Sequence, residues 1–252
     1  MDRAPDVPAG FHLVALGDVG STNDEARRLA GEGAPDGTVL WARSQSAGRG
    51  RYGRPWSSPP GNLYVSLLLR PATAPAAAVQ LGFVAAVALA EALDRHVAPD
   101  ALALKWPNDV LLNGRKIAGM LLESATGNDN KLDWLILGMG VNLQSFPVGT
   151  AFPATSLANE GYRAPAPADV LAGLCRAFAA GRARWAAAGF GPVRAAWLAR
   201  AYRRGQPIEV RLERERALGV FADLDLSGAL VLDLGAGPQR RVTFGEVFPA
   251  SA

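Results

Sequence analysis

The chain has 252 residues, of which 49% are hydrophobic, and its formal net charge is +3 at pH 7. This size and composition exclude a disordered chain and predict one large domain, or one medium and one small domain. A single cysteine, Cys175, excludes an intramolecular disulfide. The weak positive charge permits contacts with phosphates but does not require a nucleic-acid partner.

The part of the chain before Gly205 alternates between apolar runs and helical patterns. Strands are expected at residues 11–16, 38–43, 62–69, 101–105, 110–112, 116–123 and 131–139. Helices are expected at residues 23–30, 76–96, 168–187 and 192–200. Residues 44–61 have no hydrophobic period and predict a long loop, residues 127–130 a turn, and Asn113-Gly114 a type I′ hairpin. The fold class is therefore α+β with a mixed sheet.

The most apolar stretch, residues 76–93, is interrupted by Gln80 and Glu91. A bilayer span needs roughly 20 predominantly apolar residues, so we expect a buried helix and no membrane contact. No apolar signal core follows Met1, which favours a cytoplasmic location.

From Gln206 onward the pattern changes to short alternating strands, with turns expected at residues 226–228 and 235–238. We place a domain boundary near Gly205. This divides the chain into a larger domain, residues 1–204, and a small β-barrel, residues 205–252.

Residues 48–56 read GRGRYGRPW and form the most distinctive segment. Its glycines allow backbone N–H groups to approach a ligand, and its arginines are suited to phosphate or carboxylate oxygens. The positive charges should repel one another, which predicts ordering of the loop when an anion binds. A solvated basic loop or a nucleic-acid-binding tract explains the segment about equally well.

Two further segments, KWPNDV at residues 105–110 and KIAG at residues 116–119, combine charged and turn-forming residues. Lys116 can place a positive charge in a pocket, and Asp109 can orient a lysine or a magnesium ion. The alternative is a Pro-Asn-Asp turn beside an ordinary surface lysine. For Lys116 taken alone, this alternative is favoured.

Two weaker signals accompany these segments. Residues 138–142, GMGVN, end an apolar strand, so the glycines can admit a ligand and Asn142 can bond a heterocycle or phosphate. Residues 21–23, Ser-Thr-Asn, begin a helix, where capping is the default role, although three polar groups can also recognise a small polar ring.

Several other residues are expected to be structural. Cys175 lies in an apolar helical run and is expected to be buried. Trp134, Trp185 and Trp197 are assigned to the core, and residues 211–216 to a solvated alternating strand. The two histidines lack the spacing of metal ligands.

Together, the order and spacing of the Ser-Thr-Asn segment, GRGRYGRPW, KWPNDV, KIAG and GMGVN resemble the catalytic domain of biotin protein ligases. The resemblance implies a core related to lipoate ligases and class II aminoacyl-tRNA synthetases, followed by an SH3-like barrel. Regulatory members carry an N-terminal DNA-binding module. The first strand is expected too close to residue 1 for such a module, so no repressor activity or nucleic-acid partner is expected.

The resemblance also implies roles for individual residues. Biotin contacts are implied for Ser21, Thr22, Asn23, Gln45, Arg49, Gly50, Arg51 and Lys116. Nucleotide contacts are implied for Arg49, Arg51, Trp56, Lys116 and Asn142. Catalytic roles are assigned to Arg51, Lys116 and, as a local base or orienting group, Asp109. An apolar slot near Leu121 is expected to hold the biotin tail.

The implied reaction consumes biotin and ATP, with Mg²⁺ carried by the ATP and no assigned protein ligand. It yields biotinyl-5′-AMP and then transfers biotin to a lysine of a biotin carboxyl carrier protein. The oligomeric state is open, and a homodimer is one possibility. A lipoate or octanoate ligase is the nearest alternative, but its double-arginine, triple-glycine stretch is absent. A nucleic-acid-binding protein would need a wider basic face.

Overall fold

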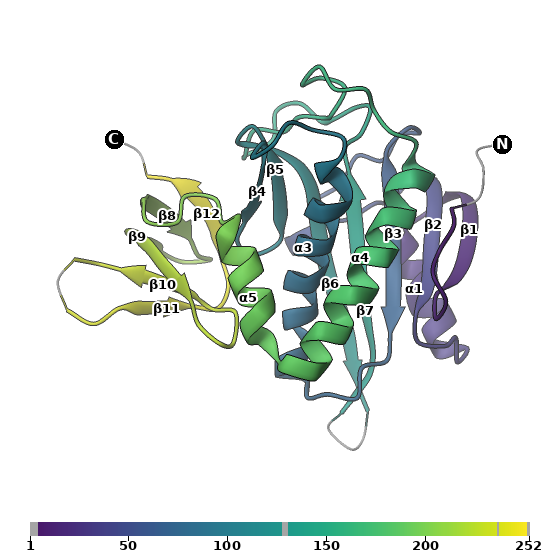
Figure 1. The fold of residues 1–252 in the computed structure, drawn as a ribbon, viewed down its shortest axis with the longest axis horizontal. Helices are drawn as coiled ribbons and strands as arrows, with labels where there is room; N and C mark the ends of the chain where they lie inside the picture. Colours follow the sequence, from purple (N-terminus) through teal and green to yellow (C-terminus); the bar gives the residue numbers. More distant parts are fainter. Residues whose placement is uncertain (1–4, 128–130, 236, 251–252) are drawn as a thin grey trace.

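The computed structural model describes residues 5–127, 131–235 and 237–250. Its larger part is built on a seven-stranded sheet with the order β1-β2-β3-β7-β6-β5-β4 (Figure 1). The strands are β1 (His12–Val19), β2 (Thr38–Gln45), β3 (Leu63–Leu69), β4 (Leu102–Lys105), β5 (Asp109–Leu112), β6 (Arg115–Thr126) and β7 (Leu132–Val141). β1 and β2 are parallel and the other neighbouring pairs are antiparallel. The predicted mixed sheet is confirmed.

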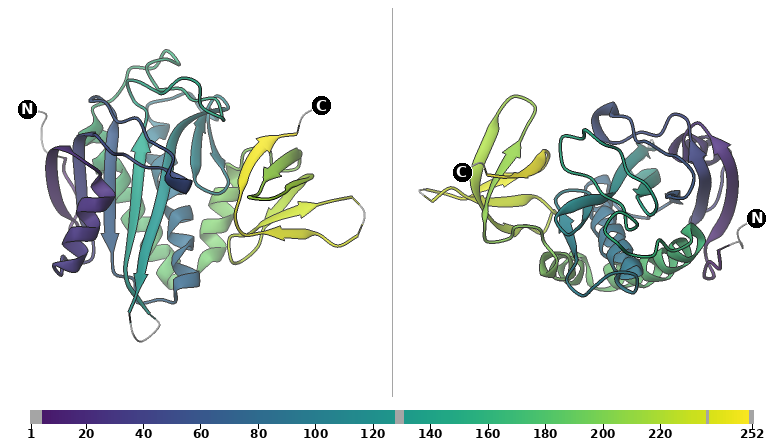
Figure 2. Two further views of the ribbon diagram at one scale, coloured as in Figure 1. Left: turned by 180° about the vertical axis from the view of Figure 1, so that it is seen from behind. Right: turned by 90° about the horizontal axis from the view of Figure 1, so that it is seen from above.

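Helices cover both faces of this sheet (Figures 1 and 2). They are α1 (Thr22–Gly31), α2 (Pro75–Ala78), α3 (Gln80–Asp94), α4 (Pro167–Ala188) and α5 (Phe190–Ala199). Strand alternation explains how the sheet serves two layers, because successive side chains point to opposite faces. Leu40, Leu68 and Ile136 pack against Ala26 of α1, whereas Leu67 belongs to the core cluster shared with α3 and α4.

The predicted buried helix at residues 76–96 is present but is divided into α2 and α3. Among the described residues, Pro75–Asp94 is the one helical stretch long and apolar enough to cross a membrane. About 67% of its most apolar 18-residue segment is buried inside the protein. It is the central helix of the core, flanked by the sheet, α4 and α5 (Figure 1).

The end of the chain forms a five-stranded antiparallel sheet with the order β11-β10-β9-β8-β12. Its strands are β8 (Pro207–Arg211), β9 (Arg216–Leu224), β10 (Leu230–Asp233), β11 (Arg240–Val242) and β12 (Glu246–Pro249). It is docked against the larger part by packing of Trp197 on Phe221 and by a hydrogen bond from Trp106 Nε1 to the Gly228 carbonyl, 3.1 Å.

Most of the predicted local features are confirmed. Asn113 and Gly114 both have positive φ, 50° and 76°, as a type I′ hairpin requires. Cys175 is buried, and burial raises the pKa of its thiol to about 12. Residues 226–228 form a turn. The turns expected at residues 127–130 and 235–238 include residues outside the described part of the chain.

One of the structural expectations was wrong, and a second holds only in part. Residues 211–216 are not one strand, because β8 ends at Arg211 and β9 begins at Arg216, and these two residues face each other across a hairpin. Of the three tryptophans assigned to the core, Trp197 is buried, but Trp134 and Trp185 are only half-buried. The Trp185 indole has a polar partner at its edge, Gln80 Oε1 at 2.7 Å.

Candidate active site

A single pocket collects side chains from segments that lie far apart in the sequence. It is lined by the start of α1, the end of β2, the loop at residues 49–57, strands β5, β6 and β7, the loop at residues 147–154, and β12. All of the residues to which the sequence assigned binding or catalytic roles line this pocket. They are Ser21, Thr22, Asn23, Gln45, Arg49, Gly50, Arg51, Trp56, Asp109, Lys116 and Asn142. The residue expected beside the biotin tail, Leu121, also lines it.

One end of the pocket is neutral and polar. Gln45 Oε1 accepts hydrogen bonds from the Thr22 backbone N–H at 2.8 Å and from the Thr22 hydroxyl at 3.1 Å. Its Nε2 donates to the Ser58 hydroxyl at 3.0 Å. Ser21, Thr22 and Asn23 are nearly buried, and the helix begins there without a side-chain cap. Ser21 occupies the N-cap position, as predicted, but no side-chain capping bond forms, so these hydroxyl and amide groups remain available to the pocket.

Two residues that the sequence reasoning missed complete this polar end. The Ser66 hydroxyl lies 2.8 Å from Thr22 Oγ1 and 2.6 Å from Asn23 Oδ1. Asn23 Nδ2 donates to Glu123 Oε2 at 2.6 Å. Ser66 is a lone hydroxyl in the apolar strand LYVSLLL, and this was the one signal in the sequence that marked it. Nothing in the sequence near Glu123 marked it.

The glycines of GMGVN have a different role from the one expected. They were expected to give a ligand room, but this space is occupied by side chains of the protein. A Cβ at Gly138 would lie 2.2 Å from Asn23 Oδ1, and a Cβ at Gly140 would lie 2.3 Å from Trp56 Nε1. β7 therefore provides a flat floor on which Asn23 and Trp56 rest, one at each end of the pocket.

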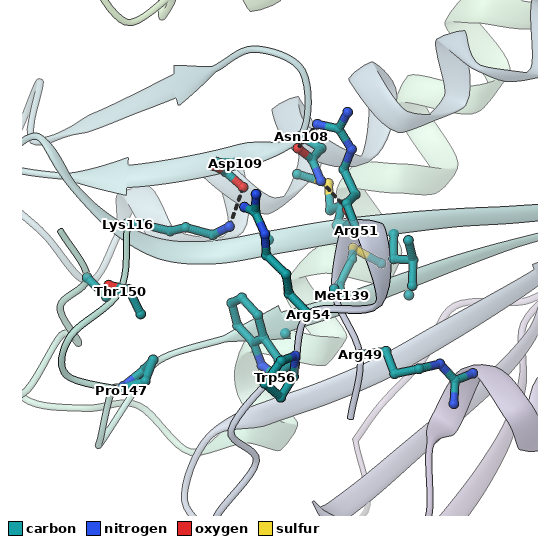
Figure 3. Close-up of a pocket in the computed structure, with 18 of the residues that line it drawn as sticks. Arg49, Arg51, Arg54, Trp56, Asn108, Asp109, Lys116, Met139, Pro147 and Thr150 are labelled. Carbon is teal, nitrogen blue, oxygen red and sulfur yellow. Dashed lines mark hydrogen bonds and ion pairs between the residues drawn. The ribbon is translucent and has the colours of Figure 1, made fainter. Parts of the chain in front are cut away.

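The opposite end of the pocket is cationic. Lys105 Nζ lies 2.7 Å from Asp109 Oδ2, and Lys116 Nζ lies 2.6 Å from Asp109 Oδ1 (Figure 3). Lys105 also lies over the Phe152 ring, 4.6 Å from its centroid. Lys105 and Asp109 are buried, whereas Lys116 is about a quarter exposed. Two lysines share one carboxylate, so the cluster carries an excess positive charge facing the pocket.

The ion pairs determine what Asp109 can do. Burial alone would raise its pKa, but Lys105 and Lys116 outweigh burial and lower the pKa to about 2. A carboxylate with such a pKa is a weak base at neutral pH. The geometry therefore favours Asp109 as the residue that orients the two lysines, and disfavours the alternative role as a local base.

The three loop arginines each have a partner on another element. Arg49 makes a two-pronged ion pair with Asp24, 2.7 and 2.5 Å, and points away from the lysine cluster (Figure 3). Arg51 donates to the Asn108 side chain and the Gly245 carbonyl, 3.3 and 3.1 Å.

Arg54, whose role the sequence did not reveal, pairs with Glu246 of β12 at 2.5 Å. The loop is closed by hydrogen bonds from Gly50 N to the Arg54 carbonyl and from Trp56 N to the Gly48 carbonyl, both 2.8 Å. The expected repulsion within the loop is offset in part, because Arg49 and Arg54 pair with Asp24 and Glu246, and ordering of the loop on anion binding stays a prediction.

Two fully buried side-chain atoms of the described pocket residues have neither a hydrogen bond nor an ion pair within the protein. Asn142 is 1% exposed and donates from Nδ2 to the Thr155 carbonyl at 3.1 Å, but its Oδ1 accepts nothing. Trp56 Nε1 is also buried without an acceptor. Buried polar groups are normally hydrogen-bonded, so the Asn142 oxygen marks a position where a ligand can complete the site, whereas the Trp56 nitrogen faces Gly140 on the floor of the pocket.

Comparisons with known proteins agree with this geometry. Residues 19–142 match the biotin/lipoate A/B protein ligase family, and residues 205–248 match the biotin protein ligase C terminal domain. The biotin–[acetyl-CoA-carboxylase] ligase of Paracoccus denitrificans is 46% identical over 235 residues, 89% of this chain and 97% of the relative. The bifunctional ligase/repressor BirA of Escherichia coli is 32% identical over 89% of this chain and 70% of its own length.

Among solved structures, the biotin protein ligase of Aquifex aeolicus in complex with biotin and ATP superposes with a TM-score of 0.79 at 27% identity. The match covers 94% of this chain and 97% of the other. With these similarities along nearly the whole chain, this protein belongs to the biotin protein ligase family.

Proposed function

We propose that this enzyme activates biotin with ATP to form biotinyl-5′-AMP and then transfers the biotinyl group to a lysine of a biotin carboxyl carrier protein. The observation that carries this proposal is one pocket with a neutral hydrogen-bonding end and a cationic end. Biotin has the matching polarity, because its ureido ring is neutral and its carboxylate is negative.

The neutral end suits the ureido group, which offers two N–H donors and one carbonyl acceptor. Gln45 and Asn23 each retain an N–H that no protein atom accepts among the bonds described above, and Thr22 retains lone pairs. Leu121 and Met139 line the pocket between its two ends and provide apolar surface for the rings and the tail.

The cationic end suits the adenylation step. The biotin carboxylate attacks the α-phosphorus, a new P–O bond forms, and the bond to pyrophosphate breaks. The obstacle is repulsion between two anions, and positioned cations lower it by stabilising charge on the phosphoryl oxygens. Lys116 is placed for this role, and the Arg51 guanidinium lies at the rim, within reach after a change of side-chain conformation.

The nucleotide is assigned to the part of the pocket near Trp56, Asn142 and β12. Trp56 offers a flat ring, and the unpaired Asn142 Oδ1 can accept from an N–H of a nucleobase. Arg49 is engaged with Asp24 in this state. Arg49 can therefore contact the ligand only if this ion pair loosens, or through its backbone N–H in place of its side chain.

Among the described residues no group of three or more His, Cys, Asp or Glu side chains is arranged to hold a metal ion. Both oxygens of Asp109 are taken by lysines, so this carboxylate does not fit Mg²⁺. We propose that Mg²⁺ enters bound to the nucleotide, where it neutralises phosphate charge.

Transfer ends the cycle. The carrier lysine amine attacks the carbonyl carbon of the mixed anhydride, an amide forms, and AMP leaves. The amine must be neutral to attack, and its free pKa is about 10.4. The closed loop over the pocket serves to keep water from the reactive anhydride.

Finer points of the assignment are also proposals. We infer that the C-terminal sheet is an SH3-like barrel and that the catalytic core is related to class II aminoacyl-tRNA synthetases. A homodimer would form at β1, beyond which no described strand lies in the sheet. The enzyme is proposed to act in the cytoplasm without binding DNA.

The test is labelling of an apo biotin carboxyl carrier domain from an acetyl-CoA carboxylase, with biotin and MgATP, read by avidin blot. The matched control is the same domain with its acceptor lysine changed to arginine. We expect label that requires ATP and the acceptor lysine. Transfer of lipoate instead of biotin would overturn the proposal in favour of the related lipoate ligases.

A further inference from the structure

Asn23 has its amide held from both sides by protein groups. Its Nδ2 donates to Glu123 Oε2 at 2.6 Å, and its Oδ1 lies 2.6 Å from the Ser66 hydroxyl. A carboxylate can only accept hydrogen bonds. The opposite orientation of the amide would place Oδ1 against the Glu123 carboxylate, two acceptors in close contact, so this orientation is excluded.

The hydroxyl of Ser66 cannot by itself determine this orientation. A serine hydroxyl both donates and accepts, so Ser66 can bond either end of an amide. The Ser66 side chain is fully buried beneath Thr22 and Asn23, and it supplies the proton that Oδ1 needs once Glu123 has fixed Nδ2. Glu123 therefore sets the direction of the amide and Ser66 completes it.

Glu123 itself is anchored by a different residue. Its second oxygen accepts from Arg27 at 2.8 Å, and the Glu123 side chain is 26% exposed. Arg27 also pairs with Asp24 and does not line the pocket. The Glu123 side chain is therefore partly exposed behind Asn23, and it can be substituted without opening the core.

We propose that Glu123, supported by Ser66, is a positioning residue that makes Asn23 present an N–H donor, and not a carbonyl oxygen, to the ligand. Within the proposed function, this donor is matched to the one acceptor of the ureido ring, its carbonyl oxygen. The pair thereby selects ligands that carry an acceptor at that position. The inference rests on the assignment of biotin to this end of the pocket.

The test compares adenylation kinetics of the wild-type enzyme with those of Glu123→Leu, Glu123→Gln and Arg28→Ala. In Glu123→Leu the amide is free to turn and the site loses one well-aligned hydrogen bond, so KM for biotin should rise about tenfold. The values of kcat and KM for ATP should stay within about twofold. Glu123→Gln keeps an acceptor oxygen and should restore most of the biotin affinity. Arg28→Ala, the matched control, removes an arginine of the same helix that pairs with Glu25 and Glu32 and not with Glu123, and should leave KM for biotin unchanged.

A biotin analogue provides a second readout. In 2-thiobiotin, sulfur replaces the oxygen of the ureido carbonyl and is a weaker hydrogen-bond acceptor. The wild-type enzyme should prefer biotin, and this preference should shrink in Glu123→Leu because both changes remove the same hydrogen bond.

The inference would be overturned if Glu123→Leu left KM for biotin unchanged, or if its preference for biotin over the thio analogue stayed as large as in the wild type. It would also be overturned if KM for biotin, KM for ATP and kcat were all impaired by the same factor. A wild-type enzyme that adenylates no biotin would refute the proposed function itself, and the inference with it.

Discussion

Removal of the Lys116 charge should abolish most adenylation while leaving the fold intact. In the structure Asp109 is shared by two lysines, so Lys116→Ala leaves the buried carboxylate paired with Lys105 at 2.7 Å. No uncompensated buried charge results, and the cost to stability should stay below about 1 kcal/mol, as for a partly exposed ion pair. The reaction instead loses a positioned cation worth about 3 kcal/mol in the transition state. At 25 °C this predicts a fall in kcat of roughly 100-fold or more.

The assay is biotin-dependent release of pyrophosphate, measured beside the thermal unfolding of each variant. Arg184→Ala is a suitable control, because Arg184 lies on the exposed side of α4 and its substitution removes the same charge far from the pocket. The control should keep wild-type rates. The reasoning is refuted if Lys116→Ala keeps its rate, or if its rate falls only because the protein has unfolded.

Three further predictions concern the pocket. Gly138→Ala should raise KM for biotin by tenfold or more but not KM for ATP, and Gly140→Ala should do the reverse. The reason is that the two added methyl groups would collide with side chains at opposite ends of the pocket. Equal effects of one variant on both KM values would contradict the assignment. Asp109 has a folded pKa of about 2, below the ordinary 3.8 of an aspartate, so its contribution of roughly 2 kcal/mol to stability is present above pH 4 and is lost as pH falls toward 2. In urea unfolding the stability gap between wild type and Asp109→Asn should therefore narrow from pH 5 to pH 2.5, and a constant gap would count against the ion-pair account. Arg51→Ala should release biotinyl-AMP about ten times faster in a filter-binding assay, and retention at the wild-type rate would remove the assigned role.

Much of the fold was predictable because local patterns and tertiary packing agree. The apolar runs that became β2, β3 and β7 bury side chains on both faces, so they read as continuous hydrophobic segments. The start of α1 was predictable from its cap-forming residue types, although no side-chain cap forms there, and the Asn113-Gly114 hairpin followed from turn chemistry. The error at residues 211–216 arose because alternating charges fit a hairpin turn as well as a solvated strand.

The site was predictable where chemistry is concentrated in short segments, and not where it depends on distant neighbours. Glu123 contacts Asn23, 100 residues away in sequence, and Ser66 contacts it across 43 residues. Glu123 has no local pattern that indicates a role, and Ser66 is marked only as the single hydroxyl of an apolar strand. The preference of Arg49 for Asp24, and the double pairing of Asp109, likewise depend on how α1, β4, β5 and β6 come together.

A crystal structure of the enzyme with biotinyl-5′-AMP tests the central claim most directly, namely that one pocket recognises a neutral ring at one end and a phosphate at the other. The account predicts the ureido carbonyl within hydrogen-bond distance of Asn23 Nδ2 and a phosphate oxygen within such distance of Lys116 Nζ. An adenylate bound in the reverse direction, or bound elsewhere on the protein with the pocket empty, would contradict it.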